Sequence, residues 1–215
     1  MTKRLKIDFV SDVSCPWCAI GLNSLELALQ RASDALHAEL HFQPFELNPH
    51  MPPQGQDAVE HLVEKYGITP EQVRDNGEMI RARGAAVGFE FRMDRRKRVY
   101  NTFDAHRLLH WAGLEGRQRE LKHALLCAYF TDGENPASHD VLVRLAAAAG
   151  LDRQRAREIL AGGAYAEETR AQERFYLEQG IHSVPAVIIN ERYLISGGQP
   201  PEVFEQALRQ VAAQV

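Results

Sequence analysis

The sequence predicts an α/β fold in which a long helical segment separates two shorter halves that contain strands. Three observations support this prediction. A strand, a helix and a second strand fit residues 5–47, helical periodicity dominates residues 57–179, and residues 183–215 contain a proline-led strand, a hairpin and a closing helix. A strand–helix–strand unit normally joins parallel strands through a right-handed crossover, so the first half should begin a parallel sheet.

The first half begins with an extended run, residues 5–10, which mixes β-branched and aromatic residues with polar ones. Apolar residues then recur at helical spacing, and we expect this helix to cover residues 16–38. Residues 39–47 alternate polar and apolar side chains, as a half-buried strand does. The turn-rich loop that starts at Asn48 leaves the carboxyl end of this strand, so it is a candidate for lining a site at this edge.

Residues 57–179 show helical patterning almost throughout. Thr69, Pro70 and Gln72 form the pattern of an N-cap, a first-turn proline and a capping glutamine, and they begin a helix predicted to run to Gly84. Further helices are predicted over residues 100–112, 119–130, 138–150, 152–162 and 164–179. Cys127 lies among apolar residues, so we expect a buried structural thiol there rather than a third redox partner.

The last segment returns to strand. Ser183, Val184 and Pro185 precede a short apolar strand over residues 186–189, and a turn brings the chain back as its hairpin partner. An amphipathic helix closes the chain. Helix, proline-led strand, hairpin and helix form the second half of a thioredoxin fold. We therefore predict a thioredoxin-like domain from residues 1–56 and 181–215, an inserted all-helical domain from residues 57–180, and a helix over residues 164–180 at their boundary.

Two thiols lie where the first strand turns into the first helix, in Ser14-Cys15-Pro16-Trp17-Cys18. Residues three apart on a helix share one face, so these thiols can form a disulfide. Ser14 is expected to cap the helix, and Pro16 falls in the first turn, where its missing N–H costs nothing. Free N–H groups and the positive end of the helix dipole favour a thiolate at Cys15. Cys15 is therefore the expected nucleophile, and the more shielded Cys18 is the expected resolving thiol.

A pair of cysteines with this spacing also occurs in zinc sites and as inert buried thiols. Structural zinc usually needs four ligands, and the chain has no second pair of cysteines at this spacing. We therefore predict no metal. Three cysteines are too few for a disulfide framework, so a catalytic or redox-sensing pair is the favoured interpretation. A non-enzymatic redox sensor or binding module stays an alternative.

The composition is that of a globular chain with a sizeable core. Hydrophobic residues make up 45% of the 215 residues and charged residues 25%, with a formal net charge of -4. This balance gives no support for a general nucleic-acid binder or for a protein of anionic membrane surfaces. Asp8 and Asp12 interrupt the apolar stretch that a secretory signal would need, so we expect a cytoplasmic location.

Four patches spread over nearly the whole chain carry a family resemblance: residues 12–18 with Ile20-Gly21, residues 44–49 with 51–52, residues 101–102 with 105–108, and Val184-Pro185 with residues 195–197. On these motifs the chain resembles the DsbA family of thioredoxin-fold oxidoreductases, and within it a cytoplasmic, FrnE-like branch. The resemblance implies that Pro185 is cis and faces the thiols, and that substrate peptides pair with the backbone at Val184. It also marks active-site support residues, namely Pro16, Trp17, Asn48, Asn101 and His106.

The activity implied by the resemblance is thiol–disulfide exchange through a mixed disulfide at Cys15, resolved by Cys18. Its substrates would be thiol- or disulfide-containing proteins, peptides or small thiols. No tightly bound cofactor is implied beyond the redox-active Cys15–Cys18 disulfide, and glutathione is a candidate reductant. The layout also resembles kappa-class glutathione transferases and 2-hydroxychromene-2-carboxylate isomerases, which carry serine in place of the nucleophilic thiol. A glutathione-dependent isomerase or transferase is therefore the main alternative.

One departure from the family pattern concerns proton transfer. Related enzymes often keep a buried carboxylate six positions before the first cysteine, but that position is Phe9 here. Asp8 is one place away, and a one-residue step points a side chain to the opposite face of a strand. Asp8 is therefore only one candidate for moving the proton of Cys18, and Glu26 and His182 are weaker candidates.

Overall fold

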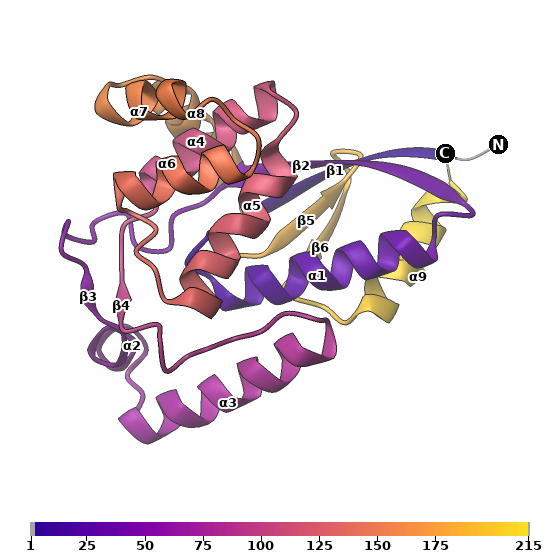
Figure 1. Cartoon of the computed structure of the whole chain (residues 1–215). Helices are drawn as coiled ribbons and strands as arrows, with labels where there is room; N and C mark the ends of the chain where they lie inside the picture. Colours follow the sequence, from indigo (N-terminus) through magenta and orange to yellow (C-terminus); the bar gives the residue numbers. More distant parts are fainter. Residues whose placement is uncertain (1–2, 215) are drawn as a thin grey trace.

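The computed structural model describes residues 3–214 (Figure 1); residues 1, 2 and 215, which the two predicted halves include, lie outside the described residues. At its centre is a four-stranded sheet with the order β2-β1-β5-β6. β1 (Lys3–Ser11) pairs in parallel with β2 (Leu36–Pro44) and antiparallel with β5 (Ala186–Ile189). β5 in turn pairs antiparallel with β6 (Tyr193–Ser196). The strands of the two ends of the chain therefore form one sheet, as the predicted fold class requires.

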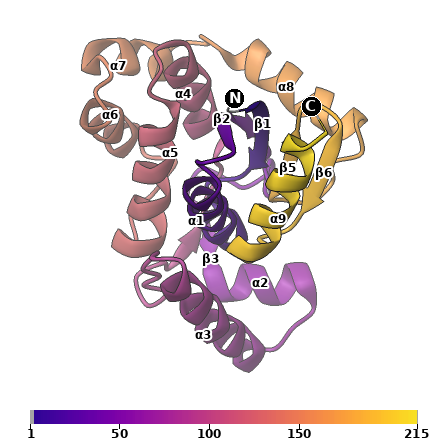
Figure 2. The same cartoon turned by 90° about the vertical axis from the view of Figure 1, so that its right-hand side faces the viewer.

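Helices cover both faces of this sheet. α1 (Pro16–Arg31) and α9 (Pro201–Ala212) pack together on one face, side by side in Figure 1 and again in the turned view of Figure 2. Phe9 of β1 points into this core, whereas Val10 packs on the other face with Tyr176 of α8 (Ala166–Glu178). Because successive side chains of a strand point to opposite faces, β1 contributes to two cores.

The segment between the two halves contains α2 (Ala58–Tyr66), α3 (Pro70–Ala86), α4 (Phe103–Leu114), α5 (Gln118–Cys127), a π-helical turn η1 (Ala128–Asp132), α6 (His139–Ala148) and α7 (Arg153–Ala161) before α8. α4 to α7 enclose a core of their own, whereas α2 and α3 lie at the opposite end of the molecule (Figure 2). The division of the chain into two domains stays a prediction. Within residues 3–214, no helix is both long and apolar enough to cross a membrane.

Local capping signals are confirmed where the predicted partners lie close in sequence. The Thr69 side chain accepts a hydrogen bond from the Gln72 backbone N–H (3.2 Å), and the Gln72 side chain accepts one from the Thr69 N–H (2.8 Å). Asp152 caps α7 by accepting from the Arg155 N–H (2.6 Å). Such bonds satisfy N–H groups that the first helical turn leaves free, so the helix starts can be predicted from local sequence.

The boundary between the first helix and the second strand was predicted wrongly. α1 ends at Arg31 rather than at residue 38, and β2 begins at Leu36 rather than at residue 39. The Ser33 hydroxyl donates to the carbonyl of Gln30 (2.8 Å), and the Ala35 N–H donates to the carbonyl of Ala32 (3.0 Å). These bonds form a tight turn, and pairing with β1 then draws residues 36–38 into the sheet.

The patterning also missed a second, two-stranded sheet. β3 (Gln56–Asp57) and β4 (Arg98–Val99) pair antiparallel within the segment that was predicted to be almost wholly helical. Each strand has only two residues, which is too short for a recognisable alternation of side chains. This pair connects the start of α2 to the segment that precedes α4.

Cys127 is exposed, so the prediction of a buried structural thiol was wrong. Its helix buries Leu121 and Leu125, which share one face of α5. With about 100° between successive residues, Cys127 lies well away from that face. The prediction counted apolar neighbours along the sequence instead of following the helical phase.

Candidate active site

Cys15 and Cys18 lie at the start of α1, at the edge of the sheet where β1 ends. Cys15 is the N-cap residue, with an extended backbone (φ −93°, ψ 115°), and its carbonyl accepts from the N–H of Cys18 (3.1 Å). Both are free thiols; Cys15 is 4% exposed and Cys18 is fully buried. The difference in exposure gives substrate easier access to the first sulfur than to the second.

The cap of α1 differs from the prediction. Cys15, not Ser14, occupies the N-cap position, and no side chain caps the helix. The Ser14 hydroxyl instead donates to the carboxylate of Asp12 (2.8 Å). The first N–H groups of α1 therefore have no side-chain acceptor. They lie next to the Cys15 sulfur, and together with the helix dipole they favour a negative charge on it.

The loop before β5 approaches the thiols from the other end of the chain. The Cys15 Sγ lies 3.7 Å from the carbonyl oxygen of Val184, and the Val184–Pro185 peptide bond is cis. Pro185 is buried and its carbonyl accepts from the N–H of Gly197 (2.8 Å), which connects this loop to the end of β6. The predicted residues Cys15, Val184 and Pro185 therefore meet in one place.

Trp17 separates the two thiols in sequence and packs towards the inserted segment. Its ring is half-buried, and the guanidinium carbon of Arg83 in α3 lies 5.6 Å from the ring centroid. Pro16 occupies the first turn of α1, as predicted from its missing N–H. α3 thus contributes a cation to the surroundings of the residue beside Cys18.

Asp12, to which the sequence gave no separate role, is a buried carboxylate just before the thiols. It accepts hydrogen bonds from the Leu47 N–H (2.7 Å), the Ser14 N–H (3.0 Å) and the Ser14 hydroxyl. Burial alone would raise the pKa of Asp12, but His106 and the two backbone N–H groups outweigh this effect and lower the pKa to about 2. Asp12 therefore fixes the turn into α1 as a permanent anion at neutral pH.

His106 is buried in α4 and points at this carboxylate. Its Nε2 lies 3.6 Å from the Asp12 Oδ1, and no other side chain or backbone group of residues 3–214 bonds that nitrogen. The structure therefore brings His106 to the anion that supports the thiol loop, and not to a thiol directly.

Asn48 and Asn101 hold the loop that follows β2. The Asn48 side-chain oxygen accepts from the Lys65 Nζ (2.7 Å), and the Asn101 amide donates to Glu46 (2.9 Å) and to the carbonyl of Pro49 (3.1 Å). These hydrogen bonds fix the loop whose Leu47 N–H binds Asp12. Both asparagines therefore act on the loop rather than on a sulfur.

None of the three candidates for proton transfer lies beside Cys18. Asp8 is buried on the opposite face of the sheet from α1, where it accepts from the Gln43 side chain (2.6 Å). Glu26 lies on α1 but pairs with Arg119 and His123 of α5, and His182 is exposed. Sequence reasoning did not consider Lys122, a fully buried lysine of α5 whose charge acts on Cys18.

The pKa of Cys18 is raised well above its usual value. Burial is the main cause, and the neighbouring Cys15 sulfur raises this pKa further, while Lys122 opposes both effects. Cys18 therefore stays a protonated thiol at neutral pH.

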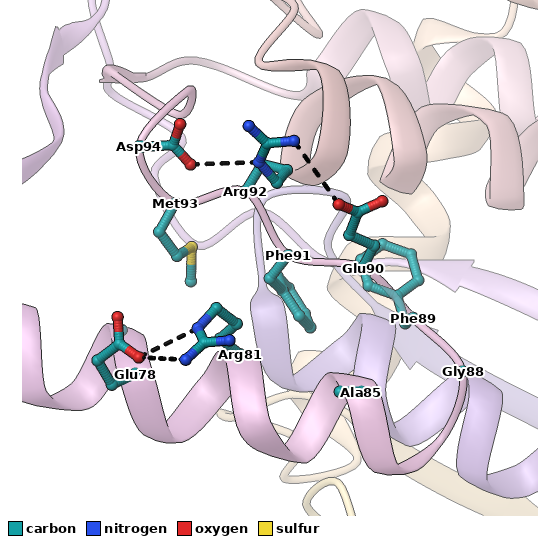
Figure 3. Close-up of a pocket in the computed structure, with 11 residues that line it drawn as sticks. Glu78, Arg81, Ala85, Gly88, Phe89, Glu90, Phe91, Arg92, Met93 and Asp94 are labelled. Atoms are coloured by element: carbon teal, nitrogen blue, oxygen red, sulfur yellow. Dashed lines mark hydrogen bonds and ion pairs between the residues drawn. The ribbon is translucent and has the colours of Figure 1, made fainter.

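A cavity of about 610 Å³ lies away from the thiols, between α3 and residues 88–94 (Figure 3). Neither thiol lines it, and its arginines are occupied: Arg81 bonds Glu78 (2.6 Å), and Arg92 lies near Glu90 (3.7 Å) and Asp94 (3.5 Å). Across the described residues, no three His, Cys, Asp or Glu side chains gather as metal ligands.

A sheet of four strands from the two ends of the chain, with α1 and α9 on one face and helices inserted between the two halves, is a thioredoxin-like fold. The sequence profile of the DSBA-like thioredoxin domain matches residues 6–209, and the chain belongs to this family. The predicted fold class and family are thereby confirmed.

Similar proteins cover almost the whole chain. The uncharacterized protein YwbO of Bacillus subtilis is 27% identical over 209 residues, which span 97% of this chain and 96% of that protein. The crystal structure of a probable DsbA oxidoreductase from Streptomyces coelicolor is 36% identical, with a TM-score of 0.92 over 98% of this chain and 91% of that one. The cytosolic disulfide reductase DsbM of Pseudomonas aeruginosa, solved with GSH, is 18% identical, with a TM-score of 0.65 over 98% and 100% of the two chains. That likeness concerns the fold alone.

Proposed function

We propose that this protein catalyses thiol–disulfide exchange with Cys15 as the nucleophile and Cys18 as the resolving thiol. The observation that carries the proposal is the position of Cys15. It lies at the start of α1, and its Sγ is 3.7 Å from the carbonyl oxygen of Val184. A peptide that paired with the Val184 backbone as an added strand would place its own sulfur next to Cys15. The raised pKa of Cys18 supports the assignment of the two roles.

In the direction of disulfide reduction, the Cys15 thiolate attacks one sulfur of the substrate disulfide and releases the other as a thiolate. Cys18 then loses its proton and attacks the Cys15 sulfur, which forms the Cys15–Cys18 disulfide and releases the second substrate thiolate. Two electrons pass from the enzyme sulfurs to the substrate. The reverse sequence oxidises a substrate dithiol, and the relative stability of the enzyme's two redox states sets the direction.

The substrates we propose are proteins, peptides or small molecules that carry a thiol or a disulfide, with glutathione as a reductant. DsbM, a structural neighbour, was solved with GSH and is named a cytosolic reductase, which is consistent with a cytoplasmic site of action. A glutathione-dependent isomerase would need one group, at position 15, to activate the thiol of glutathione, and it would need no resolving thiol. Removal of Cys18 therefore distinguishes the two functions.

The test measures the reduction of insulin disulfides with glutathione as the reductant. The precipitation of the insulin B chain reports the rate of this reduction. We expect Cys15→Ser to fall to the uncatalysed rate. Cys18→Ser should accumulate a covalent mixed disulfide between Cys15 and insulin, which only the external thiol can resolve. Cys127→Ser, which changes an exposed thiol outside the site, should retain the wild-type rate. Full activity in Cys15→Ser would refute the proposal. An isomerase would convert its aromatic substrate with Cys18 removed.

A further inference from the structure

Lys122 in α5 is a buried cationic side chain without a bonding partner. The residue is 0% exposed, and its Nζ makes no hydrogen bond to any group of residues 3–214. A buried, unpaired ammonium group is costly, because it loses its hydration and gains no bond in return. The neutral amine, which can accept a proton, is the form that such surroundings favour.

The contacts between α5 and α1 place Lys122 on the side of α5 that faces the thiols. Glu26 lies two helical turns after Cys18 on α1, and it pairs with Arg119 (2.6 Å) and His123 (2.9 Å), which flank Lys122. Leu126, one turn beyond Lys122, belongs to the same buried cluster as Cys18. α5 runs beside α1 in both Figure 1 and Figure 2. Lys122 therefore lies on the part of α5 that approaches α1, and its charge acts on Cys18.

The charges that act on Lys122 come from the thiol region. Burial lowers the pKa of Lys122, while Cys18, Asp12 and Cys15 act in the opposite direction, with Cys18 the largest of the three. From α4, His106 and His110 face Lys122 across a cavity of about 10 Å³, roughly the volume that one water molecule needs. The Nε2 of His106, which lies 3.6 Å from the Asp12 Oδ1, also lacks a hydrogen-bond partner among the described residues.

We propose that Lys122 accepts the proton that Cys18 loses when it resolves the mixed disulfide. This inference rests on the proposed exchange reaction at Cys15 and deepens it. The proton moves from the Cys18 sulfur to the Nζ of Lys122, the Cys18 sulfur bonds to the Cys15 sulfur, and the substrate sulfur leaves with the electron pair of the broken bond. The ammonium then returns its proton to the leaving thiolate or to water, so the amine is regenerated.

The carboxylates near the thiols do not fill this role. Phe9 stands on the face of β1 where a carboxylate would reach the thiols, and Asp8 is on the other face. Asp12 is saturated by hydrogen bonds from Ser14 and Leu47 and is too acidic to take a proton from a thiol. A neutral lysine is a far stronger base than such a carboxylate.

The test follows the two thiolate releases from a chromogenic aromatic disulfide in a stopped-flow instrument, in a Cys127→Ser background that removes the exposed thiol. The first release reports attack by Cys15, and the second reports resolution by Cys18. In Lys122→Met we expect the first phase to stay within about twofold and the second to slow by about 100-fold or more, the usual contribution of a general base. The second phase should then depend on hydroxide across the accessible pH range, whereas in the parent protein it should level off below the ordinary pKa of lysine.

Two checks separate an effect of Lys122 on the reaction from a failure of the variant to fold. Lys122→Met removes an unpaired buried amine, so its urea midpoint should equal or exceed that of the parent. Lys122→Gln, which is polar but cannot act as a base, should show the same slow second phase if the methionine variant unfolds. Glu120→Gln on the same helix removes only the exposed ion pair with Arg117 and should leave both phases unchanged.

The outcomes separate the two proposals. A folded Lys122 variant whose second phase keeps the parent rate and pH profile overturns the role of Lys122 and leaves the exchange reaction standing. If the parent protein releases no thiolate, or if Cys15→Ser still releases it at the same rate, the exchange proposal itself fails.

Discussion

Gly21 of α1 lies directly against Pro185. A Cβ atom on Gly21 would lie 3.0 Å from the Pro185 Cγ and 3.3 Å from the Cα of Gly198. Gly21 comes one helical turn after Cys18, so the missing side chain allows the thiol-bearing helix to approach the Val184–Pro185 loop closely. The same contact joins the first and last parts of the chain at the candidate site.

We predict that Gly21→Ala moves this loop away from the thiols. Overpacking of a tight contact should cost about 1–3 kcal/mol in the free energy of unfolding, and the rate of insulin reduction should fall with it. Urea denaturation and turnover measure the two effects. An alanine variant with unchanged turnover would show that the approach of α1 to Pro185 is not needed for exchange.

Two glycines of α3 provide a matched pair. A Cβ at Gly84 would overlap the ring of Phe91 and lie 2.8 Å from the Phe89 carbonyl, whereas at Gly77 the nearest atom, of Met93, would be 3.9 Å away. Gly84→Ala should destabilise the protein by about 1–3 kcal/mol, and Gly77→Ala should be neutral or stabilising by up to about 1 kcal/mol. Equal unfolding midpoints for the two variants would contradict this account of α3 packing.

The ionised Asp12 should make stability depend on pH. Its pKa in the folded protein, about 2, is below its ordinary value of 3.8, so the carboxylate stabilises the fold fully above about pH 4. This stabilisation, on the order of 2 kcal/mol, is lost as the pH falls through about 2. Asp12→Asn cannot ionise, so the stability difference between wild type and variant should shrink between pH 4 and pH 2 in urea titrations. Parallel curves over this range would rule out the titration of Asp12 as the cause.

Arg107 of α4 is buried and holds the connection between α7 and α8. Its guanidinium donates to the carbonyls of Ala164 (3.0 Å), Gly162 (2.6 Å) and Ile159, and it pairs with Asp104 (2.7 Å). Lysine lacks the planar fork that serves several acceptors, and it would leave buried carbonyls unpaired. Arg107→Lys should therefore cost about 2–3 kcal/mol in chemical denaturation, with unchanged attack by Cys15 in the folded variant.

Features set by near neighbours in the sequence were predictable. Three such features depend on spacing within a few residues: the capping box of Thr69 and Gln72, the hairpin over residues 186–196, and the placement of Asp8 and Phe9 on opposite faces of β1. The wrong assignment of Ser14 as the cap shows the limit of such rules. A buried carboxylate two residues earlier, Asp12, binds the same hydroxyl.

Features set by helix phase or by distant partners were missed. In α5, Lys122 falls between Leu125 and Leu126 on the helical wheel, within the apolar face, and that phase was the available signal for a buried cation. The same wheel places Cys127 away from the face, where the structure exposes it. The β3–β4 pair joins residues far apart in sequence, and no local pattern encodes it.

The central claim is that Cys15 forms the covalent intermediate and Cys18 resolves it. The most direct measurement is mass-spectrometric peptide mapping of the Cys18→Ser protein, in the Cys127→Ser background, after incubation with glutathione disulfide. We predict one added glutathione, located at Cys15 and removed by dithiothreitol, and none in the matched Cys15→Ser protein. An adduct at Cys18 in the Cys15→Ser protein, or no adduct at Cys15, would contradict the account.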